Sequence, residues 1–225
     1  MIEVTYIKHM GDDIDVVNSA RVSFGKKSRY YYGDEAEIAA NFDREWEYPT
    51  FVLDKDKKLI NYLAKNNHKS PFNHSFATFH VKAPIFVARQ LQKHEYMPWN
   101  EISRRYVDSE PEFYEPEHWR GRSADKKQGS QGVVDLKTKP TNQYALETYR
   151  NLLDDGVCPE QARMVLPQSM MTEWYWSGSL YAFAKMCSLR CADDTQLETQ
   201  LVALEIENVM LNIFPISWKA LMANL

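Results

Sequence analysis

The pattern of side chains marks three short segments of the chain, two by alternation of apolar and polar residues and one by its aromatic content. The residues alternate with a period of two over Ile2–Tyr6 and over Ser75–Lys82, and Thr172–Gly178 carries an aromatic run. A period of two places successive side chains on opposite faces of a strand. The pattern therefore predicts three strands, of which Ser75–Lys82 is central, and the apolar run Val81–Ala88 continues it as a buried strand.

Apolar residues three and four positions apart predict helices over much of the remaining chain. Asp54 is the expected N-cap of one helix, and Pro98 is expected to end another because proline cannot continue a helix. Gly156 and Pro159 mark the boundary between two more. The predicted helices cover Asp12–Val22, Asp54–Asn66, Arg89–Pro98, Thr141–Gly156, Pro159–Pro167, Ser179–Arg190 and Thr195–Ile213.

The last of these helices is apolar on more than one side. Leu197, Leu201 and Leu204 form one stripe, while Val202 and Ile206 begin a second. One stripe is enough to bury a helix against the core of a monomer. The additional stripe predicts that this helix also lies in an interface between subunits.

Two segments show little periodicity in their apolar residues. Lys26–Pro49 is rich in charged and aromatic residues and is interpreted as an insertion, either a loop or a short helix. Ser109–Pro140 is polar, contains prolines and glycines, and is predicted to be a long loop. Its basic part, His118–Gly132, has two open interpretations, a surface decoration or a lid over a phosphate-bearing ligand.

Composition narrows the class of protein. The 225 residues are 44% hydrophobic and 26% charged, as is ordinary for a soluble globular protein. We therefore expect a single α+β domain over residues 1–225, with a small, mostly antiparallel sheet and long helices. The net charge of −4 argues against nucleic acid as a partner. No apolar run reaches the roughly 18 residues that a membrane span needs, so no membrane association is expected.

The three cysteines, Cys158, Cys187 and Cys191, form no C-x-x-C pair. An odd number of thiols suits a reducing compartment better than a disulfide framework. Since no signal-peptide pattern follows Met1, we expect a cytoplasmic protein in which all three cysteines are buried small hydrophobes.

Three histidines, His68, His74 and His80, are spaced by six residues. Three imidazoles can bind zinc, but this spacing fits neither one face of a helix nor a zinc-finger pattern. We interpret them as structural or hydrogen-bonding residues, and no metal site is predicted.

The stretch Arg89–Tyr106 concentrates polar chemistry, with arginines, a lysine, a histidine and two glutamates interleaved with amides. Forked guanidinium donors suit a phosphate, and amide and carboxylate acceptors suit sugar hydroxyls or base edges. Composition alone favours a solvated helix of mixed charge. The buried run Val81–Ala88 directly before it favours a pocket.

This stretch resembles the signature of the flavin-dependent thymidylate synthases, which is R-H-R, two residues, then S-x-N-E-x-S-x-R-Y. The residues in register with its second half are Asn100, Glu101, Ser103, Arg105 and Tyr106. The first half departs from the family pattern, because Lys93–Glu95 reads K-H-E and Pro98 replaces the first serine. Similar segments follow the family order elsewhere: SARVSFGK at 19–26, HKSPFNHSFATFHVKAPIFVARQ at 68–90, ARMVLP at 162–167 and SLRCADDTQLE at 188–198.

The resemblance implies that the chain binds dUMP. Arg190 holds the place of the family's arginine in N-L-R, which stabilises negative charge at the N3–C4 edge of the pyrimidine and is implied to be catalytic. The implied dUMP contacts are Gln90, Leu91, Gln92, Lys93, Glu101, Ser103, Arg104, Arg105, Arg163 and Arg190. Ser103 is interpreted as a hydrogen-bonding group rather than a nucleophile, since no base lies beside it in the sequence.

The resemblance also implies a set of flavin contacts, namely Ser70, Lys93, His94, Glu95, Glu101, Ser179, Tyr181 and Lys185. Glu95 and Tyr181 stand where relatives have arginines, so two cationic partners of the cofactor are replaced. Either FAD is held loosely or other cations compensate, with Lys185 and the basic segment His118–Gly132 as candidates.

The implied reaction is the reductive methylation of dUMP to dTMP, with methylenetetrahydrofolate as carbon donor and FAD and NADPH as reductants, in a homotetramer whose active sites lie between subunits. No cysteine has the activating surroundings that a thiolate mechanism needs, in keeping with flavin chemistry. Two alternatives stay open. One is a flavin-dependent uridylate hydroxymethylase on the same fold; the other is a non-catalytic nucleotide- or RNA-binding protein that uses Arg104 and Arg105.

Overall fold

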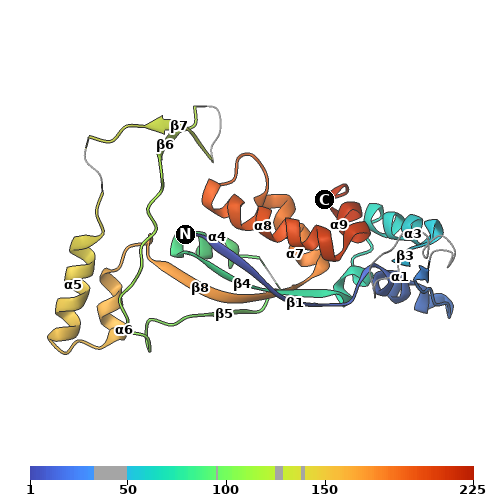
Figure 1. The fold of residues 1–225 in the computed structure, drawn as a ribbon, viewed down its shortest axis with the longest axis horizontal. Helices are drawn as coiled ribbons and strands as arrows, with labels where there is room; N and C mark the ends of the chain where they lie inside the picture. Colours follow the sequence, from blue (N-terminus) through green and yellow to red (C-terminus); the bar gives the residue numbers. More distant parts are fainter. Residues whose placement is uncertain (33–49, 95, 125–128, 138–139) are drawn as a thin grey trace, which may run out of the picture. The chain divides into compact units, whose positions relative to one another are not determined.

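The computed structural model describes residues 1–32, 50–94, 96–124, 129–137 and 140–225, and Figure 1 gives their fold. The elements of the first half are β1 (Glu3–Met10), α1 (Asp13–Arg21), η1 (Val22–Phe24), β2 (Tyr31–Tyr32), β3 (Thr50–Phe51), α3 (Asp54–Lys65), η2 (Ser70–His74), β4 (Phe76–Pro84), α4 (Ile85–Leu91) and β5 (Trp99–Glu101), where η marks a 3-10 helix. The elements of the second half are β6 (Trp119–Arg122), β7 (Ser130–Val134), α5 (Gln143–Asp154), α6 (Pro159–Ala162), η3 (Arg163–Val165), β8 (Met171–Ser179), α7 (Leu180–Arg190), α8 (Leu197–Ile213) and α9 (Pro215–Met222). The predicted α+β class is confirmed.

The chain forms two compact units, each built from separate stretches. Unit 1 takes in Met1–Ile7, Thr78–Ser177 and Met186–Ile206, and unit 2 takes in the described residues of Lys8–Ala77, Gly178–Lys185 and Glu207–Leu225. The expectation of a single domain over residues 1–225 stays a prediction.

The main sheet has the strand order β1-β4-β8-β5, and the predicted central strand is confirmed as β4. Its alternation produces the expected burial, since Ala77, Phe79 and Val81 are 1% exposed or less. At the edge, β5 pairs antiparallel with β8, and Trp99 lies opposite Trp176. Aromatic side chains pack at this edge, and β5 carries Asn100 and Glu101, the first matching residues of the signature's second half.

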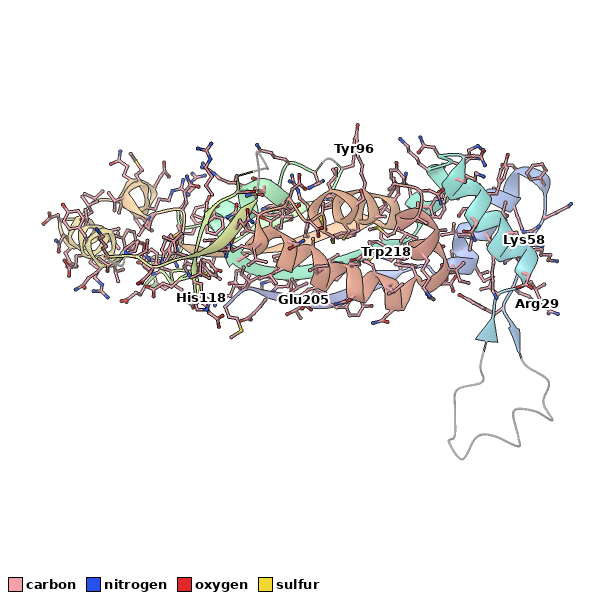
Figure 2. All side chains as sticks on the ribbon, turned by 90° about the horizontal axis from the view of Figure 1, so that it is seen from above. Arg29, Lys58, Tyr96, His118, Glu205 and Trp218 are labelled. Carbon is pink, nitrogen blue, oxygen red and sulfur yellow. The ribbon has the colours of Figure 1, made fainter. Side chains whose placement is uncertain are left out.

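Unit 2 is a helical cluster in which the buried faces of α1, α3 and α9 meet (Figures 1 and 2). Trp218 of α9 is buried, whereas Lys58 stands on the outer side of α3. Buried Asp13 accepts hydrogen bonds from the main-chain amides of Ile216 and Ser217, at the start of α9. Arg21 forms an ion pair with the fully buried carboxylate of Asp56, which gives this arginine a structural role.

The expected helices at Asp12–Val22, Asp54–Asn66 and Thr141–Gly156, and those in the last third of the chain, are confirmed with boundaries shifted by a few residues. The choice of Asp54 as N-cap is wrong. Leu53 has the extended backbone of the cap position, and Asp54 is the first helical residue. Its carboxylate still favours this helix end, because the N-terminal dipole stabilises negative charge.

The predicted helix Arg89–Pro98 is wrong, and so is the buried strand Val81–Ala88. Strand β4 ends at Pro84, and α4 already runs from Ile85 to Leu91. The main-chain amide of Ile85 donates to the carbonyl of Met170, which anchors the start of the helix. A run that is apolar throughout does not distinguish a strand from a buried helix, and this ambiguity explains the error.

The segment Ser109–Pro140 is not only a loop, because β6 and β7 form an antiparallel hairpin within it. The register shifts between Arg120 and Gly121, where the ladder contains a bulge. Both strands are largely exposed. Because neither strand has a buried face, the sequence shows no alternation of apolar and polar residues that would predict them. Strand β5 and helix α9 were also not predicted. Most of Lys26–Pro49 lies outside the described residues.

The two apolar stripes of α8 differ in burial. Leu197, Leu201 and Leu204 are 39%, 43% and 39% exposed, whereas Val202 and Ile206 are fully buried. The buried stripe is the one that packs within the chain, and the exposed leucines are left for another surface. None of the described helices is both long and apolar enough to span a membrane.

Candidate active site

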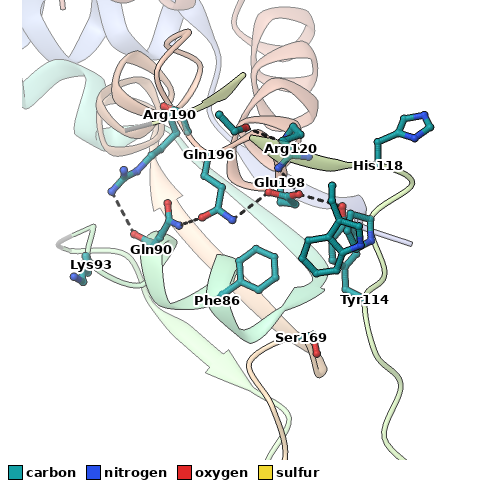
Figure 3. Close-up of a pocket in the computed structure, with 15 residues that line it drawn as sticks. Phe86, Gln90, Lys93, Tyr114, His118, Arg120, Ser169, Arg190, Gln196 and Glu198 are labelled. Carbon is teal, nitrogen blue, oxygen red and sulfur yellow. Dashed lines mark hydrogen bonds and ion pairs between the residues drawn. The ribbon is translucent and has the colours of Figure 1, made fainter. Parts of the chain in front are cut away.

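A cavity of about 820 Å³ opens in unit 1 beside α4, the last residue of α7 and the start of α8 (Figure 3). Three of the predicted dUMP contacts, Gln90, Lys93 and Arg190, line it. The other lining residues are Phe86, Tyr114, Pro116, His118, Trp119, Arg120, Gly129, Ser130, Ser169, Thr195, Gln196 and Glu198. The cavity has a polar side at α4 and α8 and an aromatic side at Phe86, Tyr114 and Trp119.

A continuous hydrogen-bonded chain runs along the polar side (Figure 3). Gln90 Nε2 donates to Gln196 Oε1 at 2.5 Å, and Gln196 Nε2 donates to Glu198 Oε2 at 3.1 Å. At the other end of the chain, Thr199 Oγ1 donates to Gln90 Oε1 at 3.2 Å. The side-chain amide of Gln90 is therefore held from both sides.

Arg190 is held at the cavity wall by two contacts. Its Nε donates to His94 Nε2 at 3.1 Å, and its Nη2 donates to the main-chain oxygen of Gln90 at 3.5 Å. A ring nitrogen that accepts a hydrogen bond carries no proton, so His94 is a neutral imidazole with its proton on Nδ1 in this arrangement. The contacts fix the plane of the guanidinium fork before any ligand binds.

Glu198 is a buried charge, 3% exposed, at the centre of the polar wall. Burial raises the pKa of its carboxyl, but the hydrogen bond and charge of Arg120, the main-chain amide and Gln196 together outweigh burial, so the pKa lies below its usual value. Tyr114 donates to the same carboxylate at 3.3 Å, and burial together with the negative charge of Glu198 raises the pKa of this phenol. Glu198 is thus held ionised and accepts hydrogen bonds from three side chains.

The β6–β7 hairpin is attached to this wall at two points. Arg120 donates from Nη2 to Glu198 Oε1 at 2.6 Å and from Nε to Ser130 Oγ of the paired strand at 2.7 Å. Gly129, with φ at +85°, comes so close to Asp194 that a Cβ would lie 3.3 Å from its carbonyl oxygen. The segment is therefore packed against the cavity wall.

The remaining dUMP contacts implied by the signature form a second group in unit 1. None of them is among the described residues that line the cavity. Arg105 and Arg163 meet at Glu160, where Arg105 Nε lies 3.3 Å from the carboxylate and Arg163 Nε donates to the main-chain oxygen at 3.2 Å. Arg104 donates to the carbonyl of Ser109, and Ser103 Oγ accepts from the amide of Arg105 at 3.3 Å.

Glu101 is fixed at the end of β5. Its carboxylate accepts from Thr172 Oγ1 at 2.6 Å and from Trp99 Nε1 at 3.1 Å. Trp99 itself stacks on Trp174 with ring centroids 4.3 Å apart. The sheet edge thus orients the glutamate that begins this second group.

Two further predicted dUMP contacts, Leu91 and Gln92, lie at the end of α4. Leu91 is fully buried, so only its main chain is available to a ligand, and Gln92 caps the end of α4 with an exposed side chain. The neighbouring Tyr96 is 91% exposed and projects from the ribbon in Figure 2.

The predicted flavin contacts divide between the units. Lys93, His94 and Glu101 belong to unit 1, and Glu95 lies outside the described residues. The four in unit 2 are Ser70, Ser179, Tyr181 and Lys185. Ser179 Oγ donates to Asn73 Oδ1 at 2.6 Å and accepts the amide of Ala182 at 3.2 Å, so it positions the first turn of α7.

Lys69 was not identified from the sequence. Its Nζ lies 5.4 Å from the centre of the Tyr181 ring, where relatives are expected to carry an arginine, and it directly precedes Ser70 at the start of η2. An ammonium group over an aromatic face is attracted by the ring. Lys69 therefore supplies a positive charge beside Tyr181.

Gln196, Glu198, Tyr114 and Trp119 were not singled out as site residues from the sequence. Gln196 and Glu198 lie within the segment at 188–198 that resembles the family, and this was the one signal that could have identified them. Arg120 lay in the segment that was left open between surface decoration and lid.

The cysteines are placed differently from the expectation of three buried residues. Cys187 is buried, Cys191 is half-buried, and Cys158 is exposed, so the expectation is wrong for Cys158. His80, one of the three histidines, pairs with Glu173 at 3.1 Å, which agrees with its interpretation as a hydrogen-bonding residue.

Comparisons with known proteins identify the class. Residues 5–216 match the family model described as thymidylate synthase complementing protein. The flavin-dependent thymidylate synthase of Thermus thermophilus is 36% identical over 222 residues, which cover 96% of this chain and 74% of that protein. The one from Thermosipho africanus is 36% identical over 219 residues, covering 94% and 86% of the two chains.

A solved structure has the same fold. It is the UMP/dUMP methylase PolB from Streptomyces cacaoi bound with 5-Br dUMP, which matches with a TM-score of 0.79 and 29% identity over 99% of this chain and 95% of that one. The chain belongs to the flavin-dependent thymidylate synthase family and is an enzyme of that family.

Proposed function

We propose that the chain converts dUMP to dTMP by reductive methylation, with the nucleotide bound in the cavity of unit 1. The observation that carries this proposal is that Gln90, Lys93 and Arg190, assigned to dUMP by the family resemblance, line one cavity although Arg190 is 100 positions from Gln90 in the sequence. An amide suits a pyrimidine edge, an ammonium suits a phosphate, and a guanidinium fork suits developing negative charge.

Arg190 is the residue proposed to act on the reacting ring. Before C5 of the pyrimidine can attack an electrophilic carbon, negative charge has to build up on the ring, and a preorganised donor at the N3–C4 edge stabilises that charge. His94 and the carbonyl of Gln90 already hold the guanidinium, so little reorganisation is needed when the charge develops.

The donor set in unit 2 fits an anionic flavin dinucleotide. Ser70 and Lys69 are exposed at η2, Lys185 is exposed on α7, and Tyr181 offers a half-buried ring. A flavin held here would, once reduced by NADPH, supply the hydride that reduces the transferred carbon. The proposed task of these side chains is to hold the negative diphosphate and the rings, with Lys69 and Lys185 providing charge where relatives use arginine.

The carbon donor is proposed to be methylenetetrahydrofolate and the reductant NADPH. The assembly is proposed to be a homotetramer in which Glu101, Ser103, Arg104, Arg105 and Arg163 contact dUMP held in the cavity of another copy. Two observations support this assembly: this group lies outside the cavity of its own chain, and the α8 leucines are exposed. The cytoplasmic location remains a prediction.

One experiment tests the reaction directly. Purified protein that absorbs as an oxidised flavin is incubated with dUMP, methylenetetrahydrofolate and NADPH, and the product is identified by mass. A product with the mass of dTMP supports the proposal. A hydroxymethylated nucleotide would instead support the uridylate hydroxymethylase, the alternative that the exchanged flavin residues Glu95 and Tyr181 favour.

A further inference from the structure

We infer that Arg120 of the β6–β7 hairpin is a positioning residue for the nucleotide, acting through Glu198 and Gln196 on the amide of Gln90. The inference rests on the proposed function, because it takes the cavity of unit 1 as the dUMP site. It assigns a role to a hairpin that the sequence left open between surface decoration and lid.

The direction of the hydrogen bonds carries the argument. An ionised carboxylate only accepts hydrogen bonds, whereas a glutamine amide both donates and accepts. Because Glu198 only accepts, Gln196 must turn its nitrogen toward Glu198 and its oxygen toward Gln90. Gln90 must then turn its nitrogen toward Gln196, and its oxygen accepts from Thr199.

One group therefore sets the orientation of two amides in series. With one N–H of Gln90 given to Gln196, the second N–H and a carbonyl lone pair remain at defined places on the cavity wall. A pyrimidine edge carries donors and acceptors in a fixed order, so it binds well to only one of the two orientations of this amide. Reversal of the amide replaces an attractive contact by a donor facing a donor.

Arg120 is what keeps Glu198 an acceptor. The side chain of Glu198 is 4% exposed, and desolvation opposes its ionisation at this depth. The bond from Arg120 Nη2, at 2.6 Å, compensates for the lost water, and the bond from Arg120 Nε to Ser130 holds the guanidinium in place. Without Arg120 the carboxyl group takes up a proton more readily and becomes a donor itself, which removes the constraint on Gln196.

The other groups around Glu198 cannot replace this charge. Tyr114 is a neutral donor whose raised pKa keeps it protonated, and Gln196 is neutral. Lys93, His118 and Arg190 line the cavity, but no ion pair joins any of them to Glu198 among the described residues. Other ionisable side chains line the cavity, so the effect of pH must be compared between each variant and the wild type.

The test measures the dissociation constant of dUMP at pH 8 and pH 6 for the wild type and four variants. Arg120→Lys keeps a positive charge but loses the fork. Arg120→Met removes the guanidinium and keeps its apolar stem. Glu198→Gln keeps the shape but lets a second N–H donor face Gln196. Arg150→Met is the matched control, because it breaks an Arg–Glu pair with Glu110 in the same unit, at exposed positions away from the cavity. Melting midpoints verify that each variant is folded.

We expect Arg120→Met to bind dUMP about tenfold more weakly than wild type at pH 6, with a smaller loss at pH 8, the size of effect that one hydrogen bond provides. Glu198→Gln should be about tenfold weaker at both pH values relative to wild type, since it has no carboxyl group to titrate. In both variants kcat at saturating dUMP should stay within about threefold of wild type, because Arg190 is unchanged. Arg120→Lys should recover part of the affinity at pH 6.

The outcomes separate the inference from the proposed function. If folded Arg120→Met and Glu198→Gln bind dUMP as the wild type does at both pH values, the inference is wrong while the proposed function stands. A merely structural role predicts a lower melting midpoint with no pH-dependent loss of affinity, and that result also contradicts it. If wild-type protein carrying flavin binds no dUMP, the proposed function fails and the inference fails with it.

Discussion

The cavity wall and the second half of the signature are both polar groups of unit 1, yet they are built differently. In the cavity wall, the side chains of Arg120 and Glu198 are 24% and 4% exposed, and each polar neighbour is bonded to the next. In the signature group, the side chains of Arg105 and Glu160 are 49% and 59% exposed. The side chains of the cavity wall are largely buried and bonded to one another, whereas those of the signature group are open to solvent.

The difference shows which side chains have a fixed direction before a ligand binds. A buried charge pair is retained only when further hydrogen bonds satisfy its atoms, and the cavity wall meets this condition. Exposed ion pairs contribute little and exchange readily with water or with another partner. The signature arginines are therefore available to a ligand or to a second chain, whereas the cavity amides have their directions fixed in advance.

The largest loss of turnover is expected for Arg190→Ala in the cavity wall. Losing one preorganised donor at a developing charge costs about 10²–10³-fold in turnover, and Arg190→Lys should not restore it because an ammonium cannot reproduce the fork. The measurement is kcat at saturating dUMP, with the melting midpoint as control. Turnover of Arg190→Ala within twofold of wild type would contradict the assignment.

The second prediction concerns the open region and asks whether two chains share a site. Arg190→Ala and Arg105→Ala are each expected to be poorly active alone. After the two proteins are unfolded together and refolded, random assembly gives roughly one site in four with both halves intact, so roughly a quarter of wild-type turnover should return. Separately refolded samples mixed afterwards are the control, and an unchanged, low turnover would show that each chain works alone.

The third prediction concerns unit 2, where Lys69 lies over Tyr181. A hydrogen bond to a charged group contributes about 1.5–3 kcal/mol, so Lys69→Ala should weaken FAD binding by at least roughly tenfold and flatten its salt dependence. Titration of FAD into flavin-free protein measures both. Lys58→Ala, which removes an exposed lysine from the same unit, should leave affinity and salt slope unchanged. Equal affinities for the two variants would contradict the role of Lys69 and leave Lys185 and the basic segment His118–Gly132 as the candidates for a compensating cation.

The smallest effect is expected at the cysteines. None of them lies among the described residues that line the cavity, and Cys187 donates to the carbonyl of Ala203 at 3.5 Å within the core. Replacing Cys158 and Cys191 by serine and Cys187 by alanine should leave dTMP formation within about twofold of wild type, with some loss of stability from the core position. Abolished turnover in a folded, flavin-loaded triple variant would indicate a thiolate mechanism.

Much of the fold followed from periodicity, and its failures have a physical cause. Strand β4 and helices α1 and α8 were predicted because one side of each is buried and the period records that burial. The hairpin was missed because both of its strands are largely exposed. Helix α4 was misplaced because the run Val81–Ala88 is apolar except for Lys82, so its period does not show where the strand ends and the helix begins.

The candidate site shows the same limit. The resemblance led to Gln90, Lys93 and Arg190, and these do line one cavity. It gave no indication of Arg120, whose role depends on a contact with Glu198, 78 positions away. Long-range pairs of this kind leave no mark in local sequence, so only the three-dimensional arrangement reveals them.

The bulge between Arg120 and Gly121 limits how this hairpin can change in length. Removing one residue from β6 reverses the face on which each later side chain lies, because the side-chain period of a strand is two. A Cβ at Gly121 would lie 2.9 Å from the carbonyl oxygen of Gln131, so a larger residue is not tolerated there either. In β6 only Trp119 precedes Arg120, so deletion of Trp119 is the change that would turn Arg120 away from Glu198.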